Sequence, residues 1–211
     1  MKKLVTMILV ASFALAGTSV FAQNVVVEAG FGVSTTSFNV LGYKPNADLY
    51  GGTFGVSYQM PLGETGLGFA PGLQFKYFTK GGVDAFGITD VSFTETYLAV
   101  PLDFNYTFPI SDDVKMLVLA GPTIDVGLTS RVKEKNTGVE YDIYSGSLSD
   151  YTKYSRFDIL LGGGLAFDVV EAVRFSVRYD YGVLNRNGGN LTSGLLKVHR
   201  SQIKLGVGLL F

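Results

Sequence analysis

The chain has 211 residues, of which 47% are hydrophobic, 13% aromatic and 17% charged, and its formal net charge at pH 7 is -1. Because basic residues do not outnumber acidic ones, the sequence lacks the charge that nucleic-acid-binding proteins carry. The absence of cysteine excludes a disulfide framework, a thiolate metal site and a catalytic thiol. Low charge combined with many aromatic residues argues against a disordered chain.

Residues 1–22 have the features of a secretory signal peptide. Lysines follow the initial methionine, residues 4–16 form an apolar run, and Val20-Phe21-Ala22 gives a small-residue cleavage signal. The run is shorter than the ~20 residues of a membrane-spanning helix, so a retained anchor is the weaker interpretation. We therefore expect this segment to be cleaved. Residues 23–211 then form a single domain, since roughly 190 residues suit one core.

From residue 25 onward, apolar and polar residues alternate with a period of two, which predicts β-strands. About eight such segments follow one another, beginning at Val25, Tyr50, Phe69, Leu98, Met116, Phe157, Val173 and Ile203. The first segment sets Val25, Val27, Ala29, Phe31 and Val33 against Glu28, Gly30, Gly32 and Ser34. The last sets Ile203, Leu205, Val207, Leu209 and Phe211 against Gln202, Lys204, Gly206 and Gly208.

The connections between these segments alternate in length. Short turns are predicted at residues 61–65, 109–113 and 170–172, and longer polar loops at residues 35–48, 80–90, 130–154 and 185–198. Outer-membrane barrels have short periplasmic turns and longer extracellular loops. The sequence therefore predicts an all-β fold, an eight-stranded antiparallel up-and-down transmembrane β-barrel in the cell outer membrane.

The two faces of the strands decide between a membrane barrel and a secreted soluble carrier, whose interior would be apolar. An eight-stranded lumen is too narrow for the many large aromatic residues, so we expect the apolar face to contact lipid. The polar face would then fill the lumen with an ion-pair network formed by Glu28, Lys76, Asp103, Asp125, Asp158, Arg178, Asp180 and Lys204. Four further charged residues are expected nearer the rims: Arg156, Asp168, Arg174 and Arg200.

Several motifs resemble those of the PorT-like outer-membrane β-barrel proteins of Bacteroidetes bacteria. They are residues 97–102 (Tyr-Leu-Ala-Val-Pro-Leu), Ala120-Gly121-Pro122, Gly162-Gly163-Gly164, and Arg178-Tyr179 with residues 182–185. The resemblance implies a small envelope barrel associated with secretion and no catalytic role. The C-terminal alternation of Leu205, Val207, Leu209 and Phe211 also resembles the signal read by the barrel-insertion machinery.

A catalytic site has weak support in the sequence. His199 and Ser201 form an H-x-S pair that resembles the lipid A deacylases, in which a carboxylate orients the histidine that activates the serine. No acidic residue follows Ser201, so we expect no catalytic residue in this chain. With a single histidine and no cysteine, we also expect no metal site and no cofactor.

The longest predicted loop carries Tyr141, Tyr144, Tyr151 and Tyr154. These tyrosines are a candidate recognition surface for an unknown protein or surface partner. The alternative that we favour is a hairpin that extends two strands above the membrane.

The expected function is that of a non-enzymatic outer-membrane barrel with a charge-plugged interior, acting as a structural or partner-binding component of the envelope. Its expected contacts are outer-membrane lipid, the barrel-insertion machinery and an unknown partner, but not nucleic acid. A lipid A-modifying enzyme, a secreted carrier barrel and a narrow pore are the alternatives.

Overall fold

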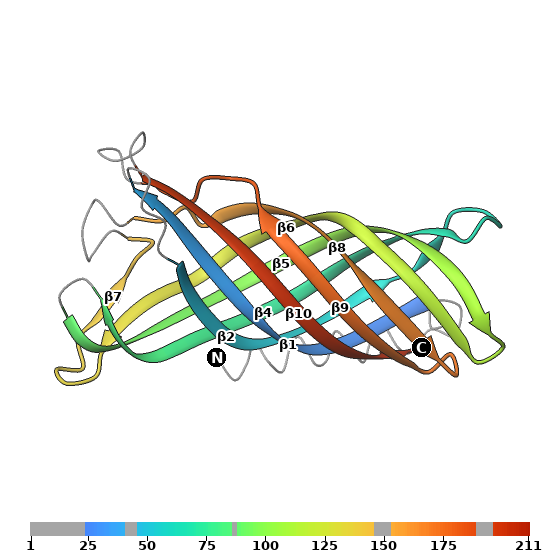
Figure 1. Ribbon diagram of the computed structural model, residues 1–211, viewed down its shortest axis with the longest axis horizontal. Coiled ribbons are helices and arrows are strands. Elements are labelled where there is room, and N and C mark those ends of the chain that lie inside the picture. Colours follow the sequence, from blue (N-terminus) through green and yellow to red (C-terminus); the bar gives the residue numbers. More distant parts are fainter. Residues whose placement is uncertain (1–23, 41–45, 86–87, 146–152, 189–195) are drawn as a thin grey trace.

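The computed structural model describes residues 24–40, 46–85, 88–145, 153–188 and 196–211. Within these ranges, eight long antiparallel strands form a closed barrel (Figure 1). The long strands are β1 (Val25–Val40), β2 (Asn46–Tyr58), β4 (Leu67–Ala85), β5 (Ile88–Ser111), β6 (Val114–Glu134), β8 (Phe157–Val169), β9 (Val173–Gly182) and β10 (Leu196–Leu210). Two short strands, β3 (Met60–Pro61) and β7 (Glu140–Asp142), pair with β4 and β6. The predicted all-β barrel is confirmed.

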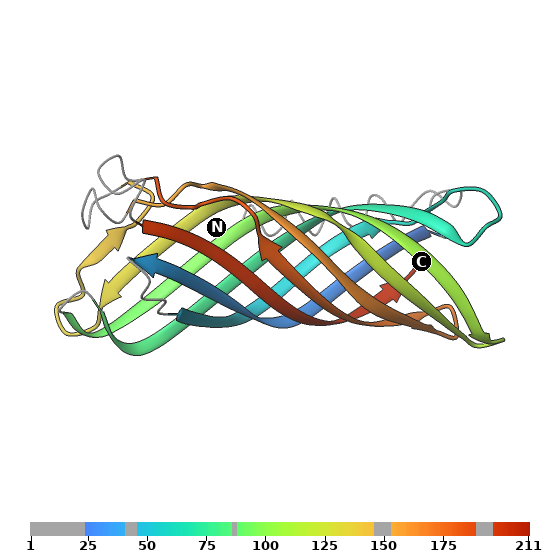
Figure 2. The ribbon, with the colours of Figure 1, turned by 45° about the horizontal axis from the view of Figure 1, so that its top comes forward.

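Each long strand pairs with its neighbours in chain order, and β10 returns to pair with β1. This seam is long, since it runs from Val26 opposite Leu210 to Val40 opposite Leu196. The strands cross the long axis of the barrel obliquely in both views (Figures 1 and 2). Because the sheet closes on itself, it presents no open edge to an apolar surrounding. Among the described residues, no helix is long and apolar enough to span a bilayer.

The two ends of the barrel differ. One end, called the turn end here, holds the short connections β3–β4, β5–β6 and β8–β9 together with the C-terminus (Figure 1). At the opposite, loop end, β7 folds back on β6, with Arg131 opposite Asp142 and Lys133 opposite Glu140 (Figure 1). The favoured hairpin interpretation therefore describes this part of the chain better than a loop.

Two of the predicted long loops are mostly strand. β1 continues to Val40 and β2 begins at Asn46, while β4 continues to Ala85 and β5 begins at Ile88. The prediction was wrong in extent because it equated polar residues with loops. Where the outer face of a barrel is exposed to water, its outward-facing residues can be polar and the strands can still be paired.

The outward face of the wall is apolar. Phe31, Phe104 and Leu205 are each more than half exposed, at 57%, 57% and 59%. Val207, Leu209 and Phe211, expected in the insertion signal, also face outward. A soluble carrier barrel requires the reverse arrangement, with polar residues outside.

The lumen at the loop end contains large apolar residues that the sequence reasoning did not place there. Leu49, Phe78 and Tyr97 form one buried cluster, and Val91, Val132 and Ile143 form another. The second cluster results from a bulge in β6. Thr96 pairs with Thr129, but the next residue of β5, Tyr97, pairs with Gly127, so Leu128 has no partner on β5. The extra residue, Leu128, reverses which positions of β6 face inward.

Candidate functional site: the charged lumen

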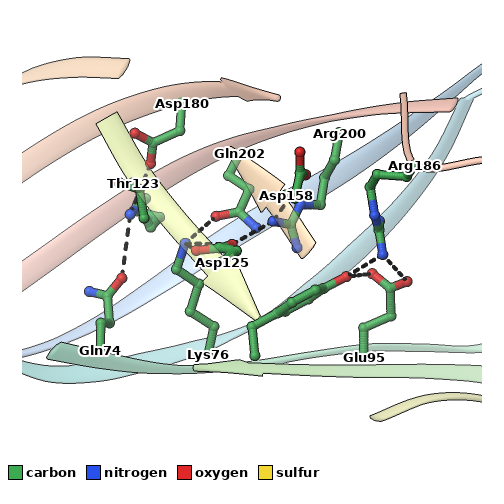
Figure 3. Close-up of polar contacts among 12 residues, drawn as sticks. Gln74, Lys76, Glu95, Thr123, Asp125, Asp158, Asp180, Arg186, Arg200 and Gln202 are labelled. Carbon is green, nitrogen blue, oxygen red and sulfur yellow. Dashed lines mark hydrogen bonds and ion pairs between the residues drawn. The ribbon is translucent and has the colours of Figure 1, made fainter. Parts of the chain in front are cut away.

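The centre of the lumen is an ion-pair layer contributed by β4, β6 and β10. The Nζ of Lys76 lies 3.0 Å from both carboxylate oxygens of Asp125, and the Arg200 guanidinium donates to the same carboxylate (Figure 3). Lys76 also donates to the Oε1 of Gln202 at 3.1 Å, and Arg200 lies 3.4 Å from the Asp158 carboxylate. The side chains of Lys76, Asp125 and Arg200 are 0% exposed. This set (Lys76, Asp125, Arg200 and Gln202) is called the central layer below.

A second group of ion pairs lies toward the turn end. The Arg178 guanidinium bridges Asp103 at 2.5 Å and Asp180 at 2.6 Å, and Lys204 lies 2.9 Å from Asp180. Arg178 also donates to the carbonyl oxygen of Gly121 at 3.2 Å. These contacts join β5, β6, β9 and β10 across the barrel.

Nearest the turn end, Arg174 and Asp168 form a buried two-point ion pair. The Nε and Nη2 of Arg174 donate to the two carboxylate oxygens of Asp168 at 2.6 and 2.8 Å. This forked geometry is the stronger form of an arginine–carboxylate contact. It lies near the rim, as the sequence pattern indicated.

A third group closes the lumen at the loop end. Arg186, in the connection that follows β9, is 1% exposed and inserts its guanidinium into the lumen (Figure 3). Its Nη2 donates to the carboxylate of Glu95 at 3.3 Å and to the hydroxyl of Tyr97 at 3.0 Å. The guanidinium of Arg200 lies 4.0 Å from the centroid of the same Tyr97 ring. A cation at this distance is attracted by the face of the ring.

All of the predicted network residues lie along the lumen, but not all form ion pairs. Lys76, Asp103, Asp125, Asp158, Arg178, Asp180 and Lys204 do so. Glu28 instead accepts a hydrogen bond from Ser176 at 3.0 Å.

The sequence analysis missed three members of the network. Arg200, expected nearer a rim, lies in the central layer, although its shared parity with Gln202 and Lys204 along β10 could have placed it there. Glu95 could have been found by continuing the alternation of β5. Arg186 is in a connection rather than a strand, so no periodicity signals its position.

The candidate tyrosine surface does not form as expected. Tyr144 is buried, and Tyr141 and Tyr154 pack partly buried against the cluster of Val91, Val132 and Ile143. Tyr151 lies outside the described residues. Burial raises the pKa of both the Tyr144 and the Tyr154 hydroxyl above the usual value. The described tyrosines therefore help to close the lumen, because their rings cover apolar residues at its loop end.

The H-x-S pair lies on the outward side of β10. The Nδ1 of His199 is 3.2 Å from the carbonyl oxygen of Gly182, and its ring stacks on Tyr181 with centroids 6.0 Å apart. No carboxylate among the described residues contacts His199. The described residues also contain no cluster of three His, Cys, Asp or Glu side chains that could hold a metal ion.

Comparisons with known proteins identify this architecture. Neisserial surface protein A is 15% identical, with a TM-score of 0.52 over 89% of this chain and 97% of that chain. Ail, the attachment invasion locus protein of Yersinia pestis, is 15% identical, with a TM-score of 0.49 over 90% of this chain and 99% of that chain. The outer membrane enzyme PagL is 13% identical, with a TM-score of 0.46 over 85% of this chain and 99% of that chain.

At 15% identity the likeness to Neisserial surface protein A shows the fold alone, and no curated protein matches the chain. A family model described as the outer membrane protein beta-barrel domain matches residues 7–211. Because that match spans nearly the whole chain, the protein belongs to the outer membrane protein β-barrel domain family.

Proposed function

We propose that this outer-membrane barrel is a non-enzymatic, non-conducting component of the envelope, whose loop end contacts a partner outside the cell. The turn end then faces the periplasm and the loop end faces outward, as in other barrels of this membrane. The central layer is the observation that carries the proposal, since fully buried ion pairs occupy the lumen from wall to wall. The resemblance to PorT-like proteins supports an envelope role associated with secretion.

The proposal that the lumen does not conduct follows from the cost of disrupting these ion pairs. A permeating ion would have to separate Lys76 and Arg200 from Asp125, leaving charges unpaired in a dry region. Removing one partner of a buried ion pair costs about 3–5 kcal/mol. Beyond this layer, the Leu49, Phe78 and Tyr97 cluster and the buried Arg186–Glu95 ion pair also occupy the lumen.

Conductance in planar bilayers tests this part of the proposal. We expect no single-channel steps from the wild-type barrel, whereas a folded triple variant, Lys76→Ala, Asp125→Ala and Arg200→Ala, opens a water path. Stable wild-type channels, or a folded triple variant that stays silent, would contradict a plug formed by these three side chains.

The projection of the barrel at its loop end supports a contact with a partner. β5 has 24 residues and β6 has 21, whereas about 9–11 tilted residues cross a bilayer. The excess carries β6 and β7 beyond the lipid, where exposed ion pairs such as Arg131–Glu140, at 2.8 Å, cover the hairpin.

A photo-crosslinking amino acid at position 139, in the exposed turn between β6 and β7, tests for this partner in the native envelope. We expect a discrete protein adduct from position 139 and none from position 177, whose valine faces lipid. Identical adduct patterns at the two positions would contradict a partner site on the hairpin.

The alternative of a lipid A-modifying enzyme is tested by the His199→Ala and Ser201→Ala variants. We expect the lipid A mass spectrum to be the same in cells with the wild type, with either variant or with no copy of the protein. An acyl-chain loss that depends on both side chains would replace the non-enzymatic proposal.

A further inference from the structure

Two cavities open into the lumen from the turn end. A cavity of about 310 Å³ is lined by the β3–β4 turn residues Gly63 and Gly66 and therefore opens at the turn end. A smaller cavity of about 80 Å³ lies deeper, and both cavities are lined by Val26, Gln59 and Arg174. Together they form one passage, called the vestibule below, from the periplasm into the barrel.

The vestibule is blind. Its deepest lining residues include Glu28, Arg178 and Lys204. The next residues toward the loop end are fully buried, among them Ser34 on β1 and Lys76 in the central layer. A solute that enters from the periplasm therefore meets the inner end of the small cavity rather than a through-path.

Glu28 differs from every other lumen carboxylate in the described residues because it has no cationic partner. Within the described ranges, its carboxylate accepts one hydrogen bond, from the Ser176 hydroxyl at 3.0 Å. The side chain lies over Gly206, where an added Cβ would stand 2.7 Å from the Glu28 carboxylate. The glycine thus provides the space in which this carboxylate lies.

The charges around the vestibule leave one negative charge in excess. Its cations are Lys115, Arg174, Arg178 and Lys204, and each already contacts an acid: Glu171, Asp168, Asp103 with Asp180, and Asp180, respectively. Four cations therefore face five carboxylates once Glu28 is counted. An uncompensated carboxylate in a partly desolvated site favours uptake of a cation.

We propose that the vestibule binds small aliphatic amines from the periplasm, with the ammonium group on the Glu28 carboxylate. An ammonium group donates three hydrogen bonds, and the small cavity presents three oxygen acceptors, the two carboxylate oxygens of Glu28 and the hydroxyl oxygen of Ser176. Its volume of about 80 Å³ holds a few water-sized groups. The aliphatic stem extends along Val26, Leu117 and Leu210 of the wider cavity.

The absence of native cysteine allows a direct test by thiol labelling. Ser57→Cys places a reporter in the small cavity, and Ser34→Cys places the matched control beyond its closed end. The probes are two methanethiosulfonate reagents of similar size, one ending in ethylammonium and the other in ethylsulfonate, applied to the folded full-length mature chain in detergent micelles.

We expect the ammonium reagent to modify Ser57→Cys about tenfold faster than the sulfonate reagent, because one nearby carboxylate attracts the first and repels the second. Free ethylammonium chloride should slow this labelling more than the same concentration of sodium chloride. Ser34→Cys should react with neither reagent until the barrel is unfolded.

A second variant assigns the preference to Glu28. Glu28→Gln in the Ser57→Cys background should abolish both the rate difference and the ethylammonium competition, whereas Asp112→Asn, at an exposed carboxylate in the turn between β5 and β6, should keep both. If Glu28→Gln fails to fold, ethylammonium competition against the reporter that retains Glu28 still decides the question. Equal rates for the two reagents, no competition by ethylammonium, or equal effects of the two variants would overturn the proposal.

This outcome is separable from the proposal of a non-conducting barrel. A blind vestibule and an open pore both permit labelling at position 57, but only an open pore permits labelling at position 34.

Discussion

Asp125 is the residue on which the central layer depends most, because Lys76 and Arg200 both donate to its carboxylate. A buried ion pair gains little over an apolar pair of the same shape, since desolvation offsets the Coulomb attraction. Losing one partner is different, because the remaining charges stay buried without compensation.

We therefore expect Asp125→Asn to lower the free energy of unfolding by about 3–5 kcal/mol. Glu171→Gln also removes the carboxylate of an ion pair, since Glu171 lies 2.6 Å from Lys115, but that pair is exposed, so the loss of stability should be much smaller. Urea unfolding in detergent micelles, followed by far-UV circular dichroism, measures both variants in a chain without tryptophan. Equal losses of unfolding free energy in the two variants would mean that water reaches the ion pairs of the central layer.

Glycines on the lumen face make room for long charged side chains from the neighbouring strand. At Gly162 an added Cβ would stand 2.0 Å from the carboxylate of Asp180, which pairs with Arg178 and Lys204. At Gly52, on the outward face, the nearest atom to an added Cβ would be at an ordinary 3.5 Å.

Gly162→Ala should therefore displace Asp180 and destabilise the barrel by about 1–3 kcal/mol, as overpacking of a filled core does. Gly52→Ala should change stability by less than about 0.5 kcal/mol, as surface substitutions do. Thermal unfolding of the two variants in the same micelles compares them. A larger loss of stability in Gly52→Ala than in Gly162→Ala would contradict the role of Gly162 in making room for Asp180.

At the scale of elements, the described start of the connection after β9, residues 183–188, includes a side chain that belongs to the barrel core. The backbone of Arg186 bonds to Val198 of β10 and to Ser155, and its side chain reaches Glu95 inside the lumen. A segment outside the strands is thus fixed at both its backbone and its side chain.

Arg186→Ala should release this connection, because Glu95 loses its cation and the backbone contacts alone are weak. We expect faster cleavage of the connection by added protease and a loss of about 3–5 kcal/mol in stability. Glu95→Gln combined with Arg186→Ala should recover part of the loss, since no buried charge is then left unpaired. Arg131→Ala, which breaks an exposed pair with Glu140, is the control and should leave protease resistance unchanged.

The elements were predictable where one physical constraint acts along a whole strand. The alternation of Ile203, Leu205 and Val207 with Gln202 and Lys204 identifies β10, because one face meets an apolar surrounding and the other a polar lumen. The bulge at Leu128 and the insertion of Arg186 were not predictable. Each depends on contacts with distant parts of the chain, such as the tyrosine and glutamate of β5, which leave no local pattern.

At the scale of the whole molecule, the outward apolar band determines the surroundings in which the barrel is stable. Val177 lies in this band, whereas Val139, of similar exposure, lies in the hairpin turn between β6 and β7 at the loop end. The same substitution at the two positions therefore separates lipid contact from water contact.

We expect Val177→Lys to destabilise the barrel in lipid bilayers by about 2–4 kcal/mol, because a lysine near the membrane midplane is costly. Val139→Lys should have almost no effect. Unfolding titrations in phospholipid vesicles give both values. Similar costs at the two positions would argue that Val177 does not face hydrocarbon.

The long pairing of β1 with β10 also has a consequence for assembly. The ring cannot be sealed until the last strand has arrived, because the partner of Val26 is Leu210, near the far end of the polypeptide. Until then, the two edge strands of the incomplete sheet have unpaired backbone N–H and C=O groups. These groups can pair with strands of other chains. We therefore expect the incomplete sheet to aggregate unless its open edges are covered until the β1–β10 seam forms.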